Sequence, residues 1–154
     1  MSEEKLSVSK IVKGTAIDHI PAGRGFLVQK ILRIDSNARA VIAANVESGK
    51  YGRKDLIKIE GKYLTPKEVN IISLIAPNAT INKIDDSRVV EKSAVKFPNL
   101  IEEVLKCPNL SCITNSENEP VITKFINAPN YNSVQCCYCD SLLKYDEIVN
   151  NLKV

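Results

Sequence analysis

The sequence contains no tryptophan and one histidine, and aromatic residues make up only 5% of its 154 residues. Proteins that bind single-stranded nucleic acid commonly stack bases on aromatic side chains, so this scarcity disfavours that function. No apolar run approaches the roughly 20 residues that a membrane-spanning helix needs. The polar start, MSEEKLSVSK, also lacks the apolar core of a secretory signal. We therefore expect a cytoplasmic protein with neither a membrane nor a nucleic acid as its partner.

Motifs that mark common catalytic sites are missing as well. The sequence has no G-x-S-x-G, H-E-x-x-H or P-loop motif. Asp18 and His19 are adjacent and could form a catalytic dyad, although a lone histidine beside an acid more often orients a ligand or supports the fold. Gly23 and Gly25 are typical of a turn before a helix. An enzyme that uses Asp18 and His19 is therefore a rival to a binding or regulatory protein.

Charge and cysteine divide the chain into two parts. Residues 1–100 carry 17 Lys and Arg against 11 Asp and Glu, a formal charge of +6, whereas residues 101–154 carry 4 against 7, a charge of −3. All five cysteines lie in the second part. These differences predict two small domains, residues 1–99 and 100–154, with a boundary near residues 97–99.

Apolar periodicity in the first part predicts alternating strands and helices. Strands are expected at 15–20, 40–46, 55–59, 80–84 and 88–95, and a helix at 25–34. A second helix begins at Thr65, where Thr65 and Glu68 form a capping box around Pro66, and it ends at Pro77. The β-α-β-β-α-β order, followed by an extension, is typical of a ferredoxin-like sandwich. Such a sheet carries both helices on one face and leaves the other face free for a ligand.

The cysteines form two pairs with the spacing of zinc ligands. Cys107 and Cys112 are a C-x4-C pair, Cys136 and Cys139 are a C-x2-C pair, and 23 residues separate the two pairs. Two such turns can present four thiolates in a tetrahedron, which leaves no open position for catalysis. Disulfides or scattered core thiols are the alternatives, but the odd count and the cytoplasmic setting disfavour disulfides.

One structural Zn²⁺ per chain is therefore expected in the second part. Cys137 is assigned as a spare thiol, although its pairing with Cys139 would give a C-x-C alternative to Cys136. A domain of this size needs a bound metal to stabilise its fold, because its apolar core is small. The expected fold class is α+β, a ferredoxin-like sandwich followed by a small all-β zinc-binding domain.

Basic residues cluster near several expected strands. They could converge into a patch for phosphate, although a solvated face is the simpler interpretation of most of them. The pattern alone does not distinguish among its members, which are Lys10, Lys13, Arg53, Lys54, Lys58, Lys83, Arg88, Lys92 and Lys96.

Four segments together resemble a known family. Residues 13–22, 52–60 and 76–85 and the Cys107-Pro-Asn segment, in this order and with these cysteine pairs, resemble the regulatory chain of aspartate carbamoyltransferase. The resemblance covers essentially the whole chain. It implies a non-catalytic subunit of pyrimidine biosynthesis that forms homodimers. The N-terminal domain would bind ATP, CTP and UTP as allosteric effectors, and the zinc domain would contact the separate catalytic chain.

The resemblance also assigns individual residues. It implies that Cys107, Cys112, Cys136 and Cys139 are the zinc ligands, that Lys92 contacts the phosphates and that Lys58 contacts the ribose and base region. The implied effector-binding residues are Val8, Lys10, Ile11, Asp18, His19, Lys58, Asn82, Ile84, Val89 and Lys92.

Three residues depart from the family pattern. Ser87 stands in place of a tyrosine, Lys10 in place of a small apolar residue and Cys137 in place of a basic residue. These departures bear on the direction and ranking of the nucleotide effects rather than on the existence of the site. The alternative function is a zinc-ribbon protein that binds nucleic acid, but the acidic charge of the cysteine-bearing part opposes it.

Overall fold

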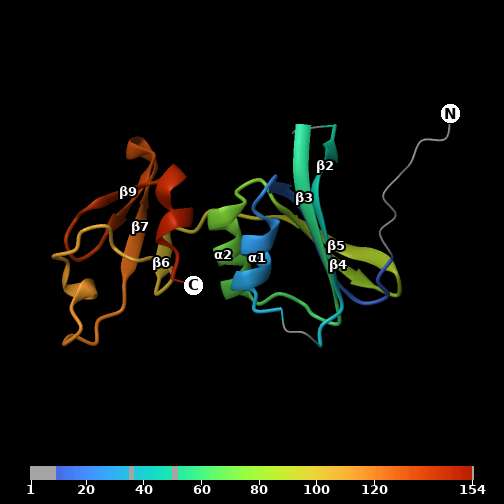
Figure 1. Cartoon of the computed structure of the whole chain (residues 1–154), viewed down its shortest axis with the longest axis horizontal. Coiled ribbons are helices and arrows are strands. Elements are labelled where there is room, and N and C mark those ends of the chain that lie inside the picture. The colour runs from blue at the N-terminus through green and yellow to red at the C-terminus, as the bar shows by residue number, and fades with distance from the viewer. Residues whose placement is uncertain (1–9, 35–36, 50–51, 154) are drawn as a thin grey trace. The chain divides into compact units, whose positions relative to one another are not determined.

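The computed structural model describes residues 10–34, 37–49 and 52–153. The chain divides into two compact units, Met1–Val95 and Lys96–Val154. The N-terminal unit contains two helices and one sheet, and the C-terminal unit contains a second sheet and short 3-10 helices (Figure 1). The expected α+β class, with a small all-β part that bears the cysteines, is confirmed.

The N-terminal unit has the expected order of elements, including the extension by a fifth strand. The five strands form an antiparallel sheet in the order β2-β3-β1-β4-β5, which is the ferredoxin-like arrangement extended by β5. Its elements are β1 (Gly14–Pro21), α1 (Gly25–Ile31), β2 (Ala40–Ser48), β3 (Gly52–Glu60), α2 (Pro66–Ile75), β4 (Thr80–Asp85) and β5 (Arg88–Ala94).

Both helices cover the same face of this sheet (Figure 1). Ile17 on β1 lies opposite Ile57 on β3, and both are fully buried. Ile72 and Ile75 of α2 and Val28 of α1 are fully buried as well. Burial of each such side chain contributes about 1.5–3 kcal/mol, so this layer holds the helices on the sheet and leaves the opposite face open.

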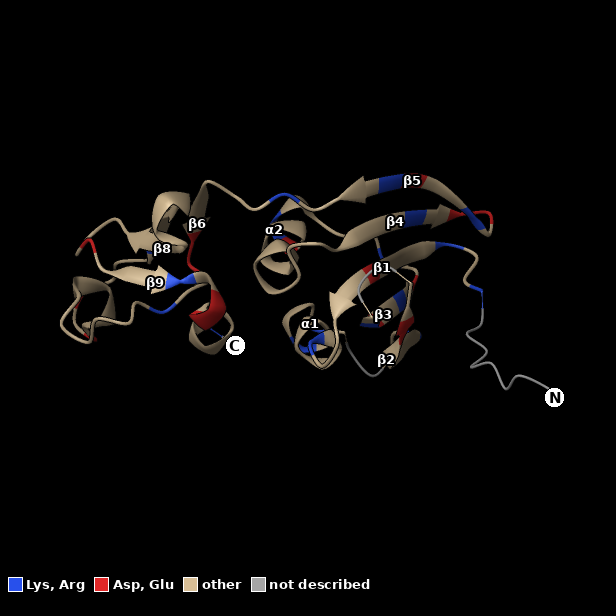
Figure 2. Ribbon diagram, turned by 90° about the horizontal axis from the view of Figure 1, so that it is seen from above, with Lys and Arg blue, Asp and Glu red and all other residues tan. Residues whose placement is uncertain are grey.

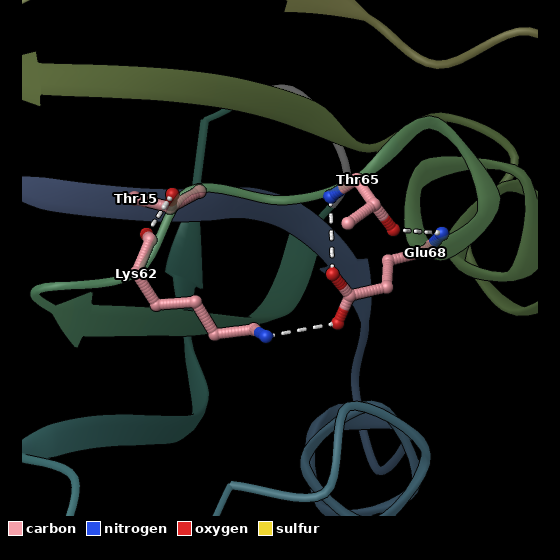
Figure 3. Close-up of polar contacts among 4 residues, drawn as sticks. All are labelled: Thr15, Lys62, Thr65 and Glu68. Carbon is pink, nitrogen blue, oxygen red and sulfur yellow. Dashed lines mark hydrogen bonds and ion pairs between the residues drawn. The ribbon is translucent and has the colours of Figure 1, made fainter.

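The capping box of α2 forms as expected. The Glu68 backbone N–H donates to Thr65 Oγ1 at 3.2 Å, and Glu68 Oε1 accepts from the Thr65 backbone N–H at 3.0 Å (Figure 3). Lys62 Nζ lies 3.1 Å from Glu68 Oε2, and the Lys62 carbonyl accepts from Thr15 Oγ1 of β1. Burial opposes the ionisation of Glu68, but the Thr65 and Lys62 partners hold its pKa below the ordinary value. The start of the helix is thereby tied to the central strand.

The first helix is shorter than its apolar stripe predicts. It ends at Ile31 instead of residue 34, because Arg33 adopts a left-handed backbone with φ of 50°. In α2 the buried residues are Ile72, Ser73, Leu74 and Ile75, whereas Val69 is only half-buried.

Two strands of the sheet are irregular. The register of β1 shifts between Ile17 and Ile20, and His19 has φ of 59°. The register of β2 shifts between Ala43 and Val46, and Asn45 has φ of 54°. Such bulges redirect side chains and increase the local twist.

The C-terminal unit is a four-stranded antiparallel sheet in the order β6-β7-β8-β9. Its strands are β6 (Leu100–Glu102), β7 (Lys124–Ala128), β8 (Ser133–Cys136) and β9 (Leu142–Lys144). Phe125, Val134 and Leu143 are fully buried on one face. Across the described residues of both units, no helix has the length and apolarity needed to cross a membrane.

Candidate metal centre and binding face

Four cysteine sulfurs meet in the C-terminal unit. The Sγ atoms of Cys107, Cys112, Cys136 and Cys139 all lie within 4.8 Å of one another. Cys107 Sγ is 3.6 Å from Cys139 Sγ, and Cys112 Sγ is 3.8 Å from Cys136 Sγ. A Zn–S bond of about 2.3 Å in a tetrahedron places the sulfurs about 3.8 Å apart, so these spacings fit one zinc ion. With all four positions taken by sulfur, the site is structural.

Hydrogen bonds around the sulfurs support thiolates. The Thr114 hydroxyl donates to Cys112 Sγ at 3.1 Å, and the Tyr138 backbone N–H donates to Cys136 Sγ at 3.4 Å. Asn115 Nδ2 holds the first turn by donating to the carbonyls of Cys107 and Asn109. These contacts orient the ligands, as outer-shell groups do at metal sites.

The sulfurs differ in how readily each ionises. Burial raises the pKa of Cys107 and of Cys136, and the neighbouring thiols raise both further. At Cys139 burial acts in the same direction, but hydrogen bonds with Ser141 and Asn109 outweigh it and lower the pKa to about 6. Four thiolates this close require a cation, which a divalent metal supplies.

Cys137 lies outside this group. Its side chain is exposed, and its backbone N–H donates to the Lys124 carbonyl. The sequence spacing leaves Cys136 and Cys137 as alternatives, and the structure brings Cys136 to the other three sulfurs.

The open face of the five-stranded sheet carries the second candidate site. One row of the register crosses all five strands, from Val41 on β2 to Lys92 on β5. Residues directly opposite one another in antiparallel strands share a face, so these five side chains lie on the side away from the helices. In order across the sheet they are Val41, Lys58, Ala16, Asn82 and Lys92.

This row combines a small side chain with an unpaired polar group. Ala16 is the smallest member and lies between Lys58 and Asn82 in the register. Asn82 Oδ1 is buried and has no hydrogen-bond partner among the described residues. An unpaired buried acceptor costs about 1–3 kcal/mol, which a donor group on a ligand would recover.

The next row carries an acid and a histidine. Asp18 Oδ1 lies 2.8 Å from Lys54 Nζ and accepts from the His19 backbone N–H at 2.7 Å. Burial opposes ionisation of Asp18, but Lys54 and this N–H outweigh it, so its pKa lies below the ordinary value. His19 Nδ1 is 3.1 Å from the hydroxyl of Thr80, which is opposite Asp18 in the register. The Asp18 carboxylate therefore forms an ion pair with Lys54 and accepts a hydrogen bond from the backbone.

A cleft of about 220 Å³ opens beside His19. Residues 19–22 form one wall, and Arg53, Lys54 and Asn78 complete the lining. Two cations and the histidine make this cleft suitable for an anionic group. Figure 2 shows further Lys and Arg on strands β4 and β5 of the same sheet.

Ile84 and Val89, two further expected effector residues, lie on β4 and β5 toward the other end of the face. Ile84 is buried and lies opposite Val89, whose side chain is 56% exposed. Lys10 is exposed and Ile11 half-buried, while Val8 lies outside the described residues. The Ser87 backbone N–H donates to the Val12 carbonyl, which ties the N-terminal segment to the β4–β5 turn.

Sequence reasoning misses three members of this face. Ala16, Val41 and Thr80 carry no recognisable motif, and only the strand register places them beside Lys58 and Asn82. Lys54 belongs to the basic cluster of the sequence, but its pairing with Asp18 depends on the fold.

Comparison with known protein families covers nearly the whole chain. Residues 6–96 match the model of the aspartate carbamoyltransferase regulatory chain, allosteric domain. Residues 99–149 match the model of the aspartate carbamoyltransferase regulatory chain, metal binding domain.

Curated relatives carry the same name. The regulatory chain of Hyperthermus butylicus is 49% identical over 150 residues, which is 96% of this chain and 94% of that protein. The regulatory chain of Pyrococcus abyssi is 49% identical over 152 residues, covering 96% of this chain and 99% of that protein. That of Haloarcula marismortui is 47% identical over 147 residues, covering 94% and 93%.

Proposed function

This chain belongs to the family of aspartate carbamoyltransferase regulatory chains, and from that premise we propose that it binds ATP, CTP and UTP on the open face of the five-stranded sheet. The chain is a non-catalytic subunit, and its partner is the separate catalytic chain. In this proposal residues 1–99 form the nucleotide-binding allosteric domain. Residues 100–154 form the zinc domain that contacts the catalytic chain, and the assembled complex lies in the cytoplasm.

One observation carries the nucleotide proposal. The register places Lys58, Asn82 and Lys92 in a single row on an exposed face, with Asn82, whose Oδ1 has no hydrogen-bond partner among the described residues, between the two lysines. A nucleoside triphosphate combines the negative charge that lysines attract with hydroxyl and amine donors that an amide oxygen accepts. The cleft beside His19 and the half-buried Asp18 extend the same surface.

The C-terminal unit supports docking of a protein partner. The zinc ligands hold both turns in place, and Asn109, Ser111 and Asp140 flank these ligands with polar groups. The Asn109 side chain is itself fixed, because its Oδ1 accepts from the Ser111 backbone N–H at 3.0 Å. Such preorganised groups lose little freedom on binding. Pairing with a second copy of this chain completes the proposed assembly.

Allosteric control requires a nucleotide to bind one quaternary state of the complex better than another. The N-terminal unit would supply this difference in affinity, and the catalytic chain would report it as a change in activity. No chemical step is assigned to Asp18 or His19.

Calorimetric titration of the full chain with ATP and with CTP tests the proposal. Lys92→Ala should lower the affinity for both nucleotides by about ten- to a hundredfold, because one charge-assisted bond contributes about 1.5–3 kcal/mol. Lys58→Ala should instead change the ratio of the affinities for ATP and CTP. Lys67→Ala is the matched control, since Lys67 is an exposed lysine on α2, which covers the other face.

Equal affinity of the Lys92→Ala and wild-type chains for both nucleotides would contradict the proposed face. The phosphates would then lie nearer to Arg53, Lys54 or Lys13. An unchanged basal activity of an assembled enzyme that carries His19→Ala is expected, because that residue has no role in the chemistry.

A further inference from the structure

The buried carboxylate of Asp55 connects three segments of the N-terminal unit. Asp55 lies on β3 and is 0% exposed. Its Oδ2 accepts from the backbone N–H groups of Gly23 at 3.0 Å and Gly25 at 2.8 Å, and its Oδ1 accepts from that of Asn45 at 2.7 Å. A buried carboxylate is tolerated only where such donors compensate its charge, and here three of them do.

These three donors lie where the sheet is irregular. Gly23 lies in the turn between β1 and α1, which follows the register shift of β1, and Gly25 is the first residue of α1. Asn45 lies within the register shift of β2 and has a left-handed backbone. Ladder hydrogen bonds are interrupted at bulges, so the position of both segments depends on side-chain contacts such as these.

The same turn continues into one wall of the cleft. Residues 19–22 line that wall, and Arg53 and Lys54, which directly precede Asp55 on β3, line the other. Asp55 is fully buried and is not a lining residue. Its bonds to Gly23 and Gly25 fix the distance between the two walls.

We propose that Asp55 is a positioning residue of the binding face, which holds His19 and the β1–α1 turn against Lys54 and links both to the exposed strand β2. The expected effect of Asp55 on nucleotide affinity rests on the proposed nucleotide function. The effect of Asp55 on the position of His19 follows from the fold alone. Through Asn45, any ligand that moves the cleft walls also strains the bulge of β2, which is an edge strand of the sheet.

An amide cannot replace this carboxylate. In Asp55→Asn one oxygen can accept from the two glycine N–H groups, but the amide NH2 then faces the N–H of Asn45, and two donors oppose each other. In the opposite orientation of the amide, its NH2 group faces the two glycine N–H groups, and both of those hydrogen bonds are lost. The substitution therefore releases either the β2 bulge or the cleft wall while it preserves the shape of the side chain.

A second variant displaces Asp55 without changing it. A Cβ added at Gly25 would lie 2.9 Å from Asp55 Oδ2, closer than side-chain atoms ordinarily approach. Gly25→Ala therefore pushes the carboxylate away from its donors. Alanine has a higher helix propensity than glycine, so the substitution does not lower the intrinsic helix propensity at the start of α1.

His19 provides a direct readout, because it is the only histidine in the chain. The ring Hε1 signal in a proton NMR spectrum therefore has one source. We expect Asp55→Asn to move this signal. We also expect it to weaken the binding of CTP, measured by calorimetry on the full chain, by about tenfold, which is the effect of one misaligned charge-assisted bond. Gly25→Ala should act in the same direction.

Thr65→Ala is the matched control for lost stability. It removes the capping box of α2, on the helix side of the sheet, and leaves the cleft walls intact. We expect the His19 signal and the affinity for CTP to stay at their wild-type values in this variant.

The proposal is overturned by a wild-type His19 signal in Asp55→Asn, or by an equal displacement of that signal in Thr65→Ala. If Asp55→Asn does not fold, an unchanged His19 signal in Gly25→Ala overturns it equally. A wild-type chain that binds no CTP contradicts the proposed function, while the His19 signal still decides whether Asp55 positions the cleft.

Discussion

Replacing one zinc ligand should unfold the C-terminal unit and leave the N-terminal unit folded. Cys112 is the informative position, because its side chain is 3% exposed and its sulfur lies 3.8 Å from that of Cys136. A serine there removes a thiolate and leaves three sulfurs around an open position. We expect the Cys112→Ser chain to lose its zinc on dialysis against a chelator, which elemental analysis measures directly.

The size of the effect follows from the small core of this unit. Its fully buried large side chains are few, and Phe125, Leu143 and Ile148 are among them. A core of this size rarely supplies more than about 3–5 kcal/mol of net stability. Structural zinc supplies about 10–16 kcal/mol, so its loss exceeds the margin that the core provides.

Limited proteolysis separates the two units in this experiment. Cys112→Ser should be cut throughout residues 96–154, while a fragment that contains β1 to β5 persists. Gel filtration with the catalytic chain should show no assembly, since the proposed docking surface requires folded turns.

Cys137→Ser is the matched control, because Cys137 is an exposed cysteine of the same segment that lies outside the sulfur cluster. It should keep one zinc per chain and resist protease like the wild type. The reasoning fails if Cys112→Ser retains a full complement of zinc, or if Cys137→Ser loses zinc as readily as Cys136→Ser does.

Two further predictions concern the N-terminal unit. Burial opposes ionisation of Asp18, but Lys54 and the His19 N–H lower its pKa below the ordinary 3.8. The resulting stabilisation is present above about pH 4 and is lost as the pH falls through the folded value. Asp18→Asn should therefore flatten the decline of the melting temperature between about pH 5 and 2, and an identical decline in both proteins would refute this. Ser87 has φ of 61° in the β4–β5 turn. Ser87→Gly should relieve about 1 kcal/mol of backbone strain and raise the melting temperature by about 4–8 °C. An unchanged melting temperature would show that the turn is unstrained.

Local signals in the sequence predict the order of elements in the N-terminal unit. The capping box at Thr65 and Glu68 involves residues three apart, so it forms wherever the helix forms. The cysteine pairs are local in the same sense, because each pair lies on one turn. The choice between Cys136 and Cys137 is different, since it depends on which thiol faces the other pair.

Composition and spacing do not select the members of the proposed binding face, and only the family resemblance assigns Lys58, Asn82 and Lys92. Lys58 and Lys92 look like any other lysine of the basic cluster, and they are 34 positions apart in the chain. They share a row because β3, β1, β4 and β5 pair in one particular register. A shift of one residue in any of these pairings would turn one of the side chains to the helix face.

The bulge in β1 shows why even the strand pattern is incomplete. In a regular strand, Ile17 and Ile20 would point to opposite faces, because they are three residues apart. The structure places both on the helix face: Ile17 lies opposite Ile57, Ile20 lies opposite Asp55, and all four are fully buried. The left-handed backbone at His19 absorbs the additional residue. Both apolar residues can then be buried while Asp18 faces Lys54 and the adjacent His19 lines the cleft, an arrangement that simple alternation does not permit.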